Sequence, residues 1–361
     1  MVGMYVYLLI FACVTIASFI INYRLKRQNL YYLMNKLPGP KGLPLIGNGL
    51  EFATNNQEII SKIEYWNKLY PSPFKVWLGP EPMVAFTNPK DVAVLLSGVA
   101  GLSRAKTFAK IFRTFLGDGL LASDDNNDQT FQKNPRKKAF LDYILELTEN
   151  DPNFKFEDIE EEVNTLMIAG YDTSTITNSF ILLAMAIHQD VQEKVWEELQ
   201  SIFGNSNRSI EIDDLQHMCY LEMVIKETLR MYPTVYVFFR QLTQDLKLDH
   251  CTVPKGASCC VAVKLIHNDP SIWPEPDKFD PDRFLPAEIY KRHPYCYIPF
   301  GAGPRNCLGY KYAMMSMKVL LATVLRAYQV DTDLKSIELD LTNTLEAKNG
   351  WLIKIRKRSS S

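Results

Sequence analysis

The chain has 361 residues, 47% of them hydrophobic, which is enough for one large domain or two ordinary ones. Its formal net charge of −1 gives no basis for a nucleic-acid partner. The seven cysteines are odd in number, scattered and never spaced Cys-x-x-Cys. This pattern argues against a disulfide framework or a zinc site and is typical of a reducing compartment.

The first element is an apolar stretch: residues 1–21 contain no charged side chain. About 20 apolar residues in a helix cross a bilayer, so we predict a transmembrane anchor over residues 1–22. Arg24, Lys26 and Arg27 follow and favour a cytoplasmic location for the rest of the chain. A cleavable signal peptide is the alternative, but a basic residue before the apolar run is missing.

Residues 23–50 form a basic flank followed by a segment that alternates proline and glycine, Leu37–Pro44. This alternation cannot continue a helix and predicts a stiff, extended hinge. The body of the protein is expected over residues 51–361. Its first predicted elements are a helix over 59–69, a strand over 74–78, a partner strand over 83–86 and a helix over 88–96.

Helical periodicity dominates from residue 139 onward. Within the longest predicted helix, Ala169–Ser174 contains a glycine, an acid and two hydroxyl side chains. Such side chains compete for backbone groups and can bend a helix, although in isolation they could simply form a polar face. The predicted helices here cover 139–147, 156–188, 191–203 and 221–232, with a strand within 235–242.

The segment Phe300–Gly309 places Cys307 in a glycine-rich loop directly before an apolar run, Tyr310–Val324. Glycines allow backbone N–H groups to approach a sulfur atom, and the positive end of a following helix favours the thiolate. A thiolate held this way is the axial ligand that pushes electron density onto haem iron and favours O–O cleavage. Alone, a cysteine near glycines would favour the alternative of a small buried hydrophobe.

This segment resembles the haem-binding loop of the cytochrome P450 superfamily at every fixed position: Phe300, Gly303, Arg305, Cys307 and Gly309. The resemblance implies a mainly α fold with a small β region. It also implies that Cys307 binds the iron of a haem b, that Phe300 shields the sulfur and that Arg305 holds a propionate.

Other residues match the same family. Asp172 and Thr173 match the pattern over the distal side of the haem, where the helix opens and both side chains deliver protons to bound dioxygen. Arg240 matches an arginine that pairs with a propionate, although it could also be a surface arginine.

Glu227 and Arg230 match the Glu-x-x-Arg element, which locks with an arginine further on, here Arg283. In an arbitrary helix such a pair would be exposed and contribute little. In this family it is a structural clamp under the haem loop.

The segments Leu116–Leu121 and Arg136–Asp142 and the stretch around Asp172 most resemble the fatty-acid ω-hydroxylase branch, insect members especially. Many members of that branch carry a glutamate that forms an ester to the haem, where this chain has Ala169, so we expect non-covalent haem. The resemblance implies hydroxylation of a lipophilic substrate with dioxygen and with electrons from an NADPH-dependent flavin reductase. It also implies an endoplasmic reticulum membrane location with the body facing the cytosol.

The resemblance is interrupted at a seam near residues 123–136. The middle helices of the family and their Trp-x-x-x-Arg element, which binds a propionate, have no counterpart here. We therefore predict an internally truncated domain. A non-catalytic remnant or splice form with impaired haem binding is the alternative to an active enzyme.

Overall fold

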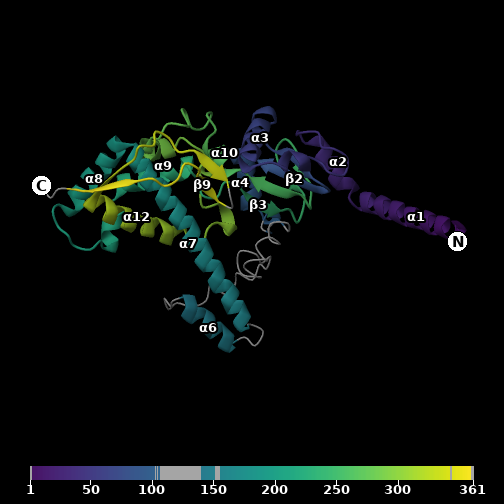
Figure 1. Ribbon diagram of the computed structural model, residues 1–361, viewed down its shortest axis with the longest axis horizontal. Coiled ribbons are helices and arrows are strands. Elements are labelled where there is room, and N and C mark those ends of the chain that lie inside the picture. The colour runs from purple at the N-terminus through teal and green to yellow at the C-terminus, as the bar shows by residue number, and fades with distance from the viewer. Residues whose placement is uncertain are drawn as a thin grey trace.

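The computed structural model describes residues 2–101, 103, 105, 140–150, 155–341 and 344–358. Helices dominate, and a four-stranded sheet lies near the end of the body that carries the N-terminal helix (Figure 1). The mainly helical class with a small β region is thus confirmed. The helices are α1 (Val2–Lys26), α2 (Gln28–Lys36), α3 (Asn56–Leu69), α4 (Pro89–Ser97), α6 (Phe140–Asn150), α7 (Phe156–Ile187), α8 (Gln189–Phe203), α9 (Cys219–Met231), α10 (Val263–His267), α11 (Pro286–Ile289) and α12 (Tyr310–Ala327).

Within the described residues, the strands are short and form one four-stranded sheet and three two-stranded antiparallel pairs, β7–β10, β4–β5 and β8–β9. They are β1 (Phe74–Leu78), β2 (Glu81–Phe86), β3 (Phe238–Gln241), β4 (Leu246–Lys247), β5 (Thr252–Val253), β6 (Ser258–Val261), β7 (Tyr328–Asp331), β8 (Leu339–Leu341), β9 (Leu345–Ala347) and β10 (Lys354–Lys357).

Local sequence signals account for the helix boundaries. The Asn88 side chain accepts a hydrogen bond from the Lys90 N–H at the start of α4, where Pro89 occupies the first turn. Gly204 ends α8 with a φ of +52°, and Pro233 follows the end of α9. The predicted helices and the strand over 74–78 are confirmed within a few residues.

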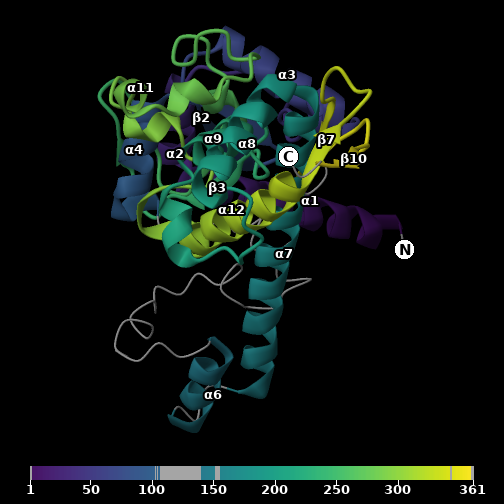
Figure 2. The ribbon, with the colours of Figure 1, turned by 90° about the vertical axis from the view of Figure 1, so that its left-hand side faces the viewer.

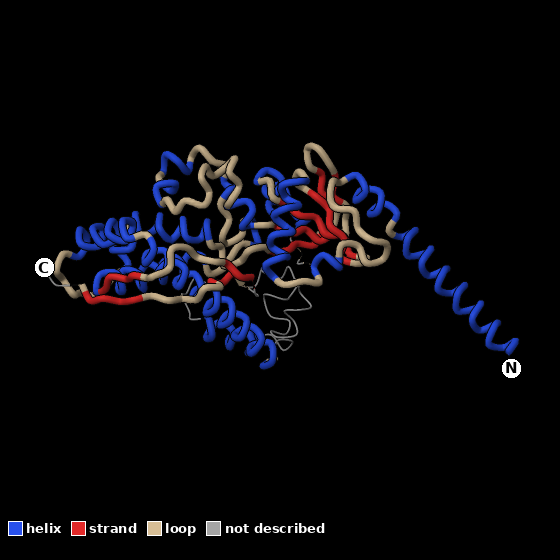
Figure 3. Tube along the Cα trace, turned by 45° about the horizontal axis from the view of Figure 1, so that its top comes forward, coloured by secondary structure: helices blue, strands red, loops and turns tan. Residues whose placement is uncertain are grey.

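Helix α1 extends from the body toward the N-terminus as an isolated helix (Figures 1 and 3). Among the residues that the structure describes, no helix provides a stretch long and apolar enough to cross a bilayer. The predicted transmembrane anchor over residues 1–22 is therefore not confirmed.

Part of the predicted basic flank and hinge packs against the body. Leu30 and Met34 of α2 and the following Leu37 are buried in a core shared with β2 and β6. Their spacing of four and three residues places them on one helix face, a pattern that the hinge prediction overlooked. The Lys75 N–H of β1 also donates to the Pro38 carbonyl at 2.8 Å, so the proline–glycine segment lies along this strand.

The main sheet has the order β1-β2-β6-β3. The β1–β2 and β6–β3 pairs are antiparallel, whereas β2 and β6 run parallel. Arg240 of β3 pairs in register with Cys259 of β6, so the predicted cofactor-binding arginine lies on an edge strand of this sheet.

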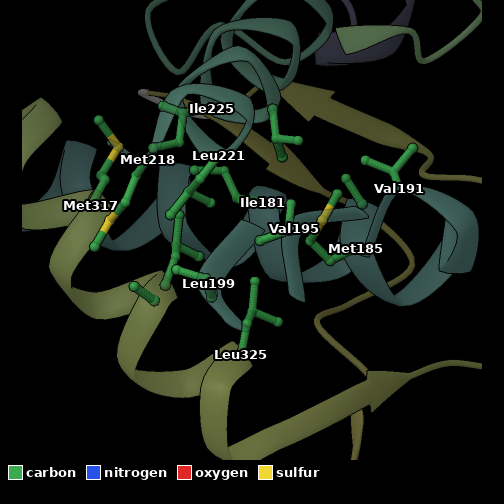
Figure 4. Packing of buried hydrophobic residues seen from close by; sticks show 14 of the residues in the cluster. Ile181, Met185, Val191, Val195, Leu199, Met218, Leu221, Ile225, Met317 and Leu325 are labelled. Atoms are coloured by element: carbon green, nitrogen blue, oxygen red, sulfur yellow. The ribbon is translucent and has the colours of Figure 1, made fainter. Parts of the chain in front are cut away.

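The larger core lies between α7, α8, α9 and α12. Ile181, Val195, Leu199 and Leu221 are fully buried and meet between these helices (Figure 4). Truncating such a leucine to alanine typically costs about 2–5 kcal/mol. This core fixes the C-terminal half of α7 and the whole of α9, and α9 carries the predicted clamp residues Glu227 and Arg230.

The N-terminal half of α7 projects from this core, with α6 at its far end (Figure 2). We call residues 156–174 the projecting half of α7. It exposes Met167, Ile168 and Tyr171, although Ile159 is buried near α6. The predicted seam over 123–136 falls outside the described residues.

Candidate active site

Cys307 lies in the loop between a 3₁₀ turn, Gly303–Arg305, and the start of α12. Its N–H donates to the Phe300 carbonyl at 2.8 Å, which closes the loop. The cysteine is exposed and forms no disulfide. Because α12 begins at Tyr310, the predicted helix after the cysteine is confirmed, and its positive end lies close to the thiol.

The two predicted glycines, Gly303 and Gly309, lie in different backbone environments. Gly303 has a φ of +74°, and a Cβ there would lie 2.1 Å from the Leu96 carbonyl oxygen of α4. Only glycine allows the loop to pack this closely against α4. Gly309 has ordinary backbone angles, and a Cβ there would lie 3.9 Å from the Cys307 sulfur.

The remaining predicted cofactor-binding residues surround the same loop. Phe300 packs edge-on against Tyr310, with ring centroids 4.8 Å apart. The Arg240 guanidinium donates from Nη2 to the Arg305 carbonyl at 3.3 Å. The structure therefore brings Phe300, Arg240 and Arg305 together with Cys307.

Asp172 and Thr173 are half-buried on α7. The helix is continuous through them, so the predicted opening is not found. The Thr173 hydroxyl donates to the Ala169 carbonyl at 2.6 Å, and the Thr177 hydroxyl donates to the Thr173 carbonyl at 2.7 Å. The hydroxyls thus satisfy carbonyls one turn back without interrupting the helix.

A buried contact joins this part of α7 to the segment after α9. The hydroxyl oxygens of Thr177 and Thr234 lie 2.8 Å apart, and both residues are buried. Within the described ranges no hydrogen bond connects Thr173 to the cysteine loop. The structure therefore does not join the two halves of the predicted site directly.

The predicted clamp is present and buried. Arg230 donates from Nε and Nη2 to the two Glu227 carboxylate oxygens at 2.7 and 2.9 Å. Arg283 Nε lies 3.4 Å from Glu227 Oε1, and the Asp280 N–H donates to that oxygen at 2.9 Å. Burial raises the pKa of the Glu227 carboxyl, and the hydrogen bonds from Arg230 oppose this rise.

His267 connects this clamp to the cysteine loop, a role that sequence reasoning missed. Its carbonyl accepts from Arg230 Nη1 at 2.9 Å, and its Nε2 accepts from the Ile298 N–H at 2.9 Å. Burial, assisted by the charges of Arg230 and Lys264, lowers the pKa of His267 to about 3. The sequence did offer a signal for this role. His267 ends the mostly apolar segment 259–267, where a buried histidine is expected to be a neutral hydrogen-bond acceptor.

A family model described as cytochrome P450 matches residues 37–129 and 124–353. The chain belongs to the cytochrome P450 family. Members of this family use a haem b whose iron has an axial cysteine thiolate. The two matched segments meet at residues 124–129, within the predicted seam.

Several family relatives are similar to this chain over 62–73% of its length. Cytochrome P450 4g15 of Drosophila melanogaster is 40% identical over 268 residues, which cover 73% of this chain and 45% of the relative. Cytochrome P450 4g1 of the same species is 44% identical over 247 residues, or 67% of this chain and 44% of the relative. Cytochrome P450 4V2 of Mus musculus is 41% identical over 226 residues, or 62% and 43%. The chain thus spans less than half the length of these relatives.

The residues at the loop fit a haem. The exposed Cys307 thiol lies just before the start of α12. A single protein ligand suits an iron whose other ligands come from a porphyrin. Cys307 is accordingly the residue that would hold the iron.

Proposed function

We propose that this chain binds haem b through Cys307 and acts as a haem-thiolate monooxygenase on a lipophilic substrate. The observation that carries the proposal is the exposed Cys307 thiol just before α12, in a loop that the hydrogen bond from the Cys307 N–H to the Phe300 carbonyl closes. When bound, haem supplies the activation of dioxygen that lets one oxygen atom enter a C–H bond.

Each site residue then has a defined task. The Cys307 thiolate holds the iron, while Phe300 keeps water from its sulfur. Arg305 and Arg240, adjacent through the Arg240–Arg305 hydrogen bond, bind the propionates. Asp172 and Thr173 would hold and move protons. Gly303 and Gly309 let the loop approach α4 and the cofactor.

Haem is expected to be non-covalent, because the Ala169 side chain has no carboxylate to form an ester. Extraction of the loaded protein with acidic organic solvent should remove all of the haem from the polypeptide, as measured by absorbance of the organic phase. Haem that stays with the protein would contradict this expectation.

The substrate and the electron donor are parts of the same proposal. Exposed apolar side chains on the projecting half of α7 and beside the cysteine, among them Met167, Tyr171 and Leu308, support a lipophilic substrate. Two electrons per turnover would come from an NADPH-dependent flavin reductase.

We further propose that α1 attaches the chain to the endoplasmic reticulum membrane, with the body on the cytosolic side. The helix exposes apolar side chains such as Ile10, Phe11 and Phe19 and has no acidic residue in its first turn. Arg24 and Lys26 lie in its last turn, as expected at a cytosolic membrane surface.

A non-catalytic remnant is the second candidate. It is supported by the 43–45% share of the relatives that this chain covers and by the exposed apolar side chains of the projecting half of α7. The domain would then be truncated at the seam over 123–136 and would bind haem poorly.

The experiment that separates the two candidates is a carbon monoxide spectrum of the reduced, full-length chain. A red-shifted Soret band that disappears in Cys307→Ala supports thiolate ligation. Cys219→Ala, which removes another exposed cysteine, is the matched control and should leave the spectrum unchanged. Absence of haem from the unmodified chain would favour the remnant, and an unchanged Cys307→Ala spectrum would overturn the ligand assignment.

A further inference from the structure

A chain of hydroxyl groups leads from the body of the protein to Thr173 on α7. The Thr177 hydroxyl donates to the Thr173 carbonyl at 2.7 Å, and its oxygen lies 2.8 Å from the Thr234 hydroxyl oxygen. A hydroxyl has a single hydrogen, and that of Thr177 is already directed to the carbonyl. Thr234 is therefore the donor in the second bond. The chain runs in one direction, from Thr234 through Thr177 to the backbone of Thr173.

This chain lies where α7 leaves the body. Tyr171 is exposed and Thr173 is half-buried, whereas Ile176 and Thr177 are buried. Thr234 is buried as well. Because water does not reach such a position to replace a lost partner, removing one of the two hydroxyls leaves the other group unsatisfied. The pair thus joins α7 to the body one turn after Thr173.

The position of Thr234 is itself fixed by neighbouring hydrogen bonds. Lys264 donates from Nζ to the Met231 carbonyl, and its N–H donates to the Tyr236 carbonyl at 3.2 Å. The Leu345 N–H donates to the Thr234 carbonyl at 3.0 Å. These bonds hold the connection after α9 at both ends and at its centre. Thr234 therefore gives α7 a fixed point of attachment.

The same connection leads to the cysteine loop. It follows α9, whose Arg230 donates to the His267 carbonyl at 2.9 Å. His267 in turn accepts from the Ile298 N–H at 2.9 Å, two residues before Phe300 in the chain. The two halves of the predicted site, which no direct hydrogen bond joins among the described residues, are therefore connected through the hydroxyl pair.

We propose that Thr177 and Thr234 are positioning residues that keep the turn of α7 between Ala169 and Thr173 closed and so set the place of the Thr173 hydroxyl. The inference rests on the proton task proposed for Thr173. The bond from Thr177 secures the carbonyl of the residue from which that side chain projects. Without the pair the turn loosens, the Thr173 hydroxyl separates from the Ala169 carbonyl, and its hydrogen becomes available to other acceptors.

The first test is hydrogen exchange of the full chain as purified, followed in peptides that cover residues 165–180, and it does not depend on haem. In Thr177→Val and in Thr234→Val, exchange there should accelerate by about tenfold, as expected where a buried hydrogen bond is lost. Thr177→Ser keeps the hydroxyl and should restore the original rate. Ser179→Ala is the matched control, because Ser179 donates at 2.9 Å to the Thr175 carbonyl within α7. Equal exchange in Thr177→Val and Ser179→Ala would overturn the proposal.

The second test asks whether the pair acts through Thr173. Hydrogen-bond donors beside a haem ligand alter its electronic state, and a hydroxyl that donates to carbon monoxide lowers the C–O stretching frequency. In the reduced protein with carbon monoxide, Thr177→Val and Thr234→Val should each lower this frequency, and neither should do so when combined with Thr173→Val. A merely structural role would not depend on the Thr173 hydroxyl in this way.

The outcomes separate this inference from the function on which it rests. No shift in either single variant, or an equal shift with Thr173→Val present, would overturn the role of the pair and leave haem binding intact. An unmodified chain that takes up no haem would overturn the proposed function, and hydrogen exchange would still decide whether the pair holds the turn closed.

Discussion

The two halves of α7 have opposite surroundings. In the C-terminal half, Ile181 and Met185 are fully buried in the core with α8, α9 and α12. In the projecting half, Met167 and Tyr171 are 65% and 74% exposed. Thr173 lies at the border between these halves. The helices around the clamp and the cysteine loop are thus tightly packed. The side chains of α7 that are proposed to face the substrate are exposed to solvent.

The largest expected effect comes from the packed side. Glu227→Gln removes the charge between Arg230 and Arg283 and leaves two buried guanidiniums without a counter-charge. We expect the free energy of unfolding to fall by about 3–5 kcal/mol, measured by urea denaturation.

The matched control is Tyr171→Ser on the projecting half of α7. Because Tyr171 is largely exposed, we expect a change within about 0.5 kcal/mol. A comparable loss in both variants would mean that the projecting half is covered in solution and would break the comparison.

The next effect concerns the contact between the cysteine loop and α4. Gly301 and Gly303 both have positive φ, +70° and +74°, but only at Gly303 would a Cβ lie 2.1 Å from a carbonyl oxygen. Gly301→Ala should cost about 1 kcal/mol from its backbone conformation. Gly303→Ala should cost about 3 kcal/mol and also reduce haem uptake, because the loop must move away from Leu96. Equal costs in the two variants would show that the loop does not depend on this contact.

A smaller effect is expected in the pH dependence of the unfolding free energy, and it tests the packed side of the comparison. His267 has a folded-state pKa of about 3, whereas an unfolded histidine titrates near about 6.5. The unfolded chain therefore binds the proton first, and stability is lost as the pH falls from about 6.5 toward 3. The loss should reach about 1 kcal/mol per pH unit.

His267→Gln should flatten this dependence of the unfolding free energy on pH, since a glutamine carbonyl can still accept from the Ile298 N–H. His217→Gln, at an exposed position, is the control and should retain the full slope. Identical slopes in the two variants would show that His267 is not the buried neutral base described here.

Sequence reasoning reached most elements because helix caps, prolines and apolar spacing are local signals. It also found the clamp and the cysteine loop, where residue types at fixed spacing define the chemistry. It missed the packing of α2, because the buried pair Leu30 and Met34 lies in a nine-residue helix between the basic residues 24–27 and the following prolines and glycines. It also missed His267, because its role depends on a contact with Ile298 that becomes visible only in the folded chain.

The opening of α7 was expected from resemblance and not found. The side chains that could disturb the helix have partners within it: Thr173 donates to Ala169, and Thr177 donates to Thr173. Whether a hydroxyl breaks a helix or returns to it depends on neighbouring contacts, here the buried bond to Thr234, which no local pattern reveals.

The Thr173 hydroxyl has a directional consequence. Its single hydrogen is committed to the Ala169 carbonyl, so only its oxygen lone pairs remain available to an incoming molecule. A water molecule or another polar molecule that approaches Thr173 therefore meets a hydrogen-bond acceptor, the hydroxyl oxygen. Before the threonine can donate its hydrogen elsewhere, the hydroxyl must turn about the Cβ–Oγ1 bond and give up its hydrogen bond to the Ala169 carbonyl.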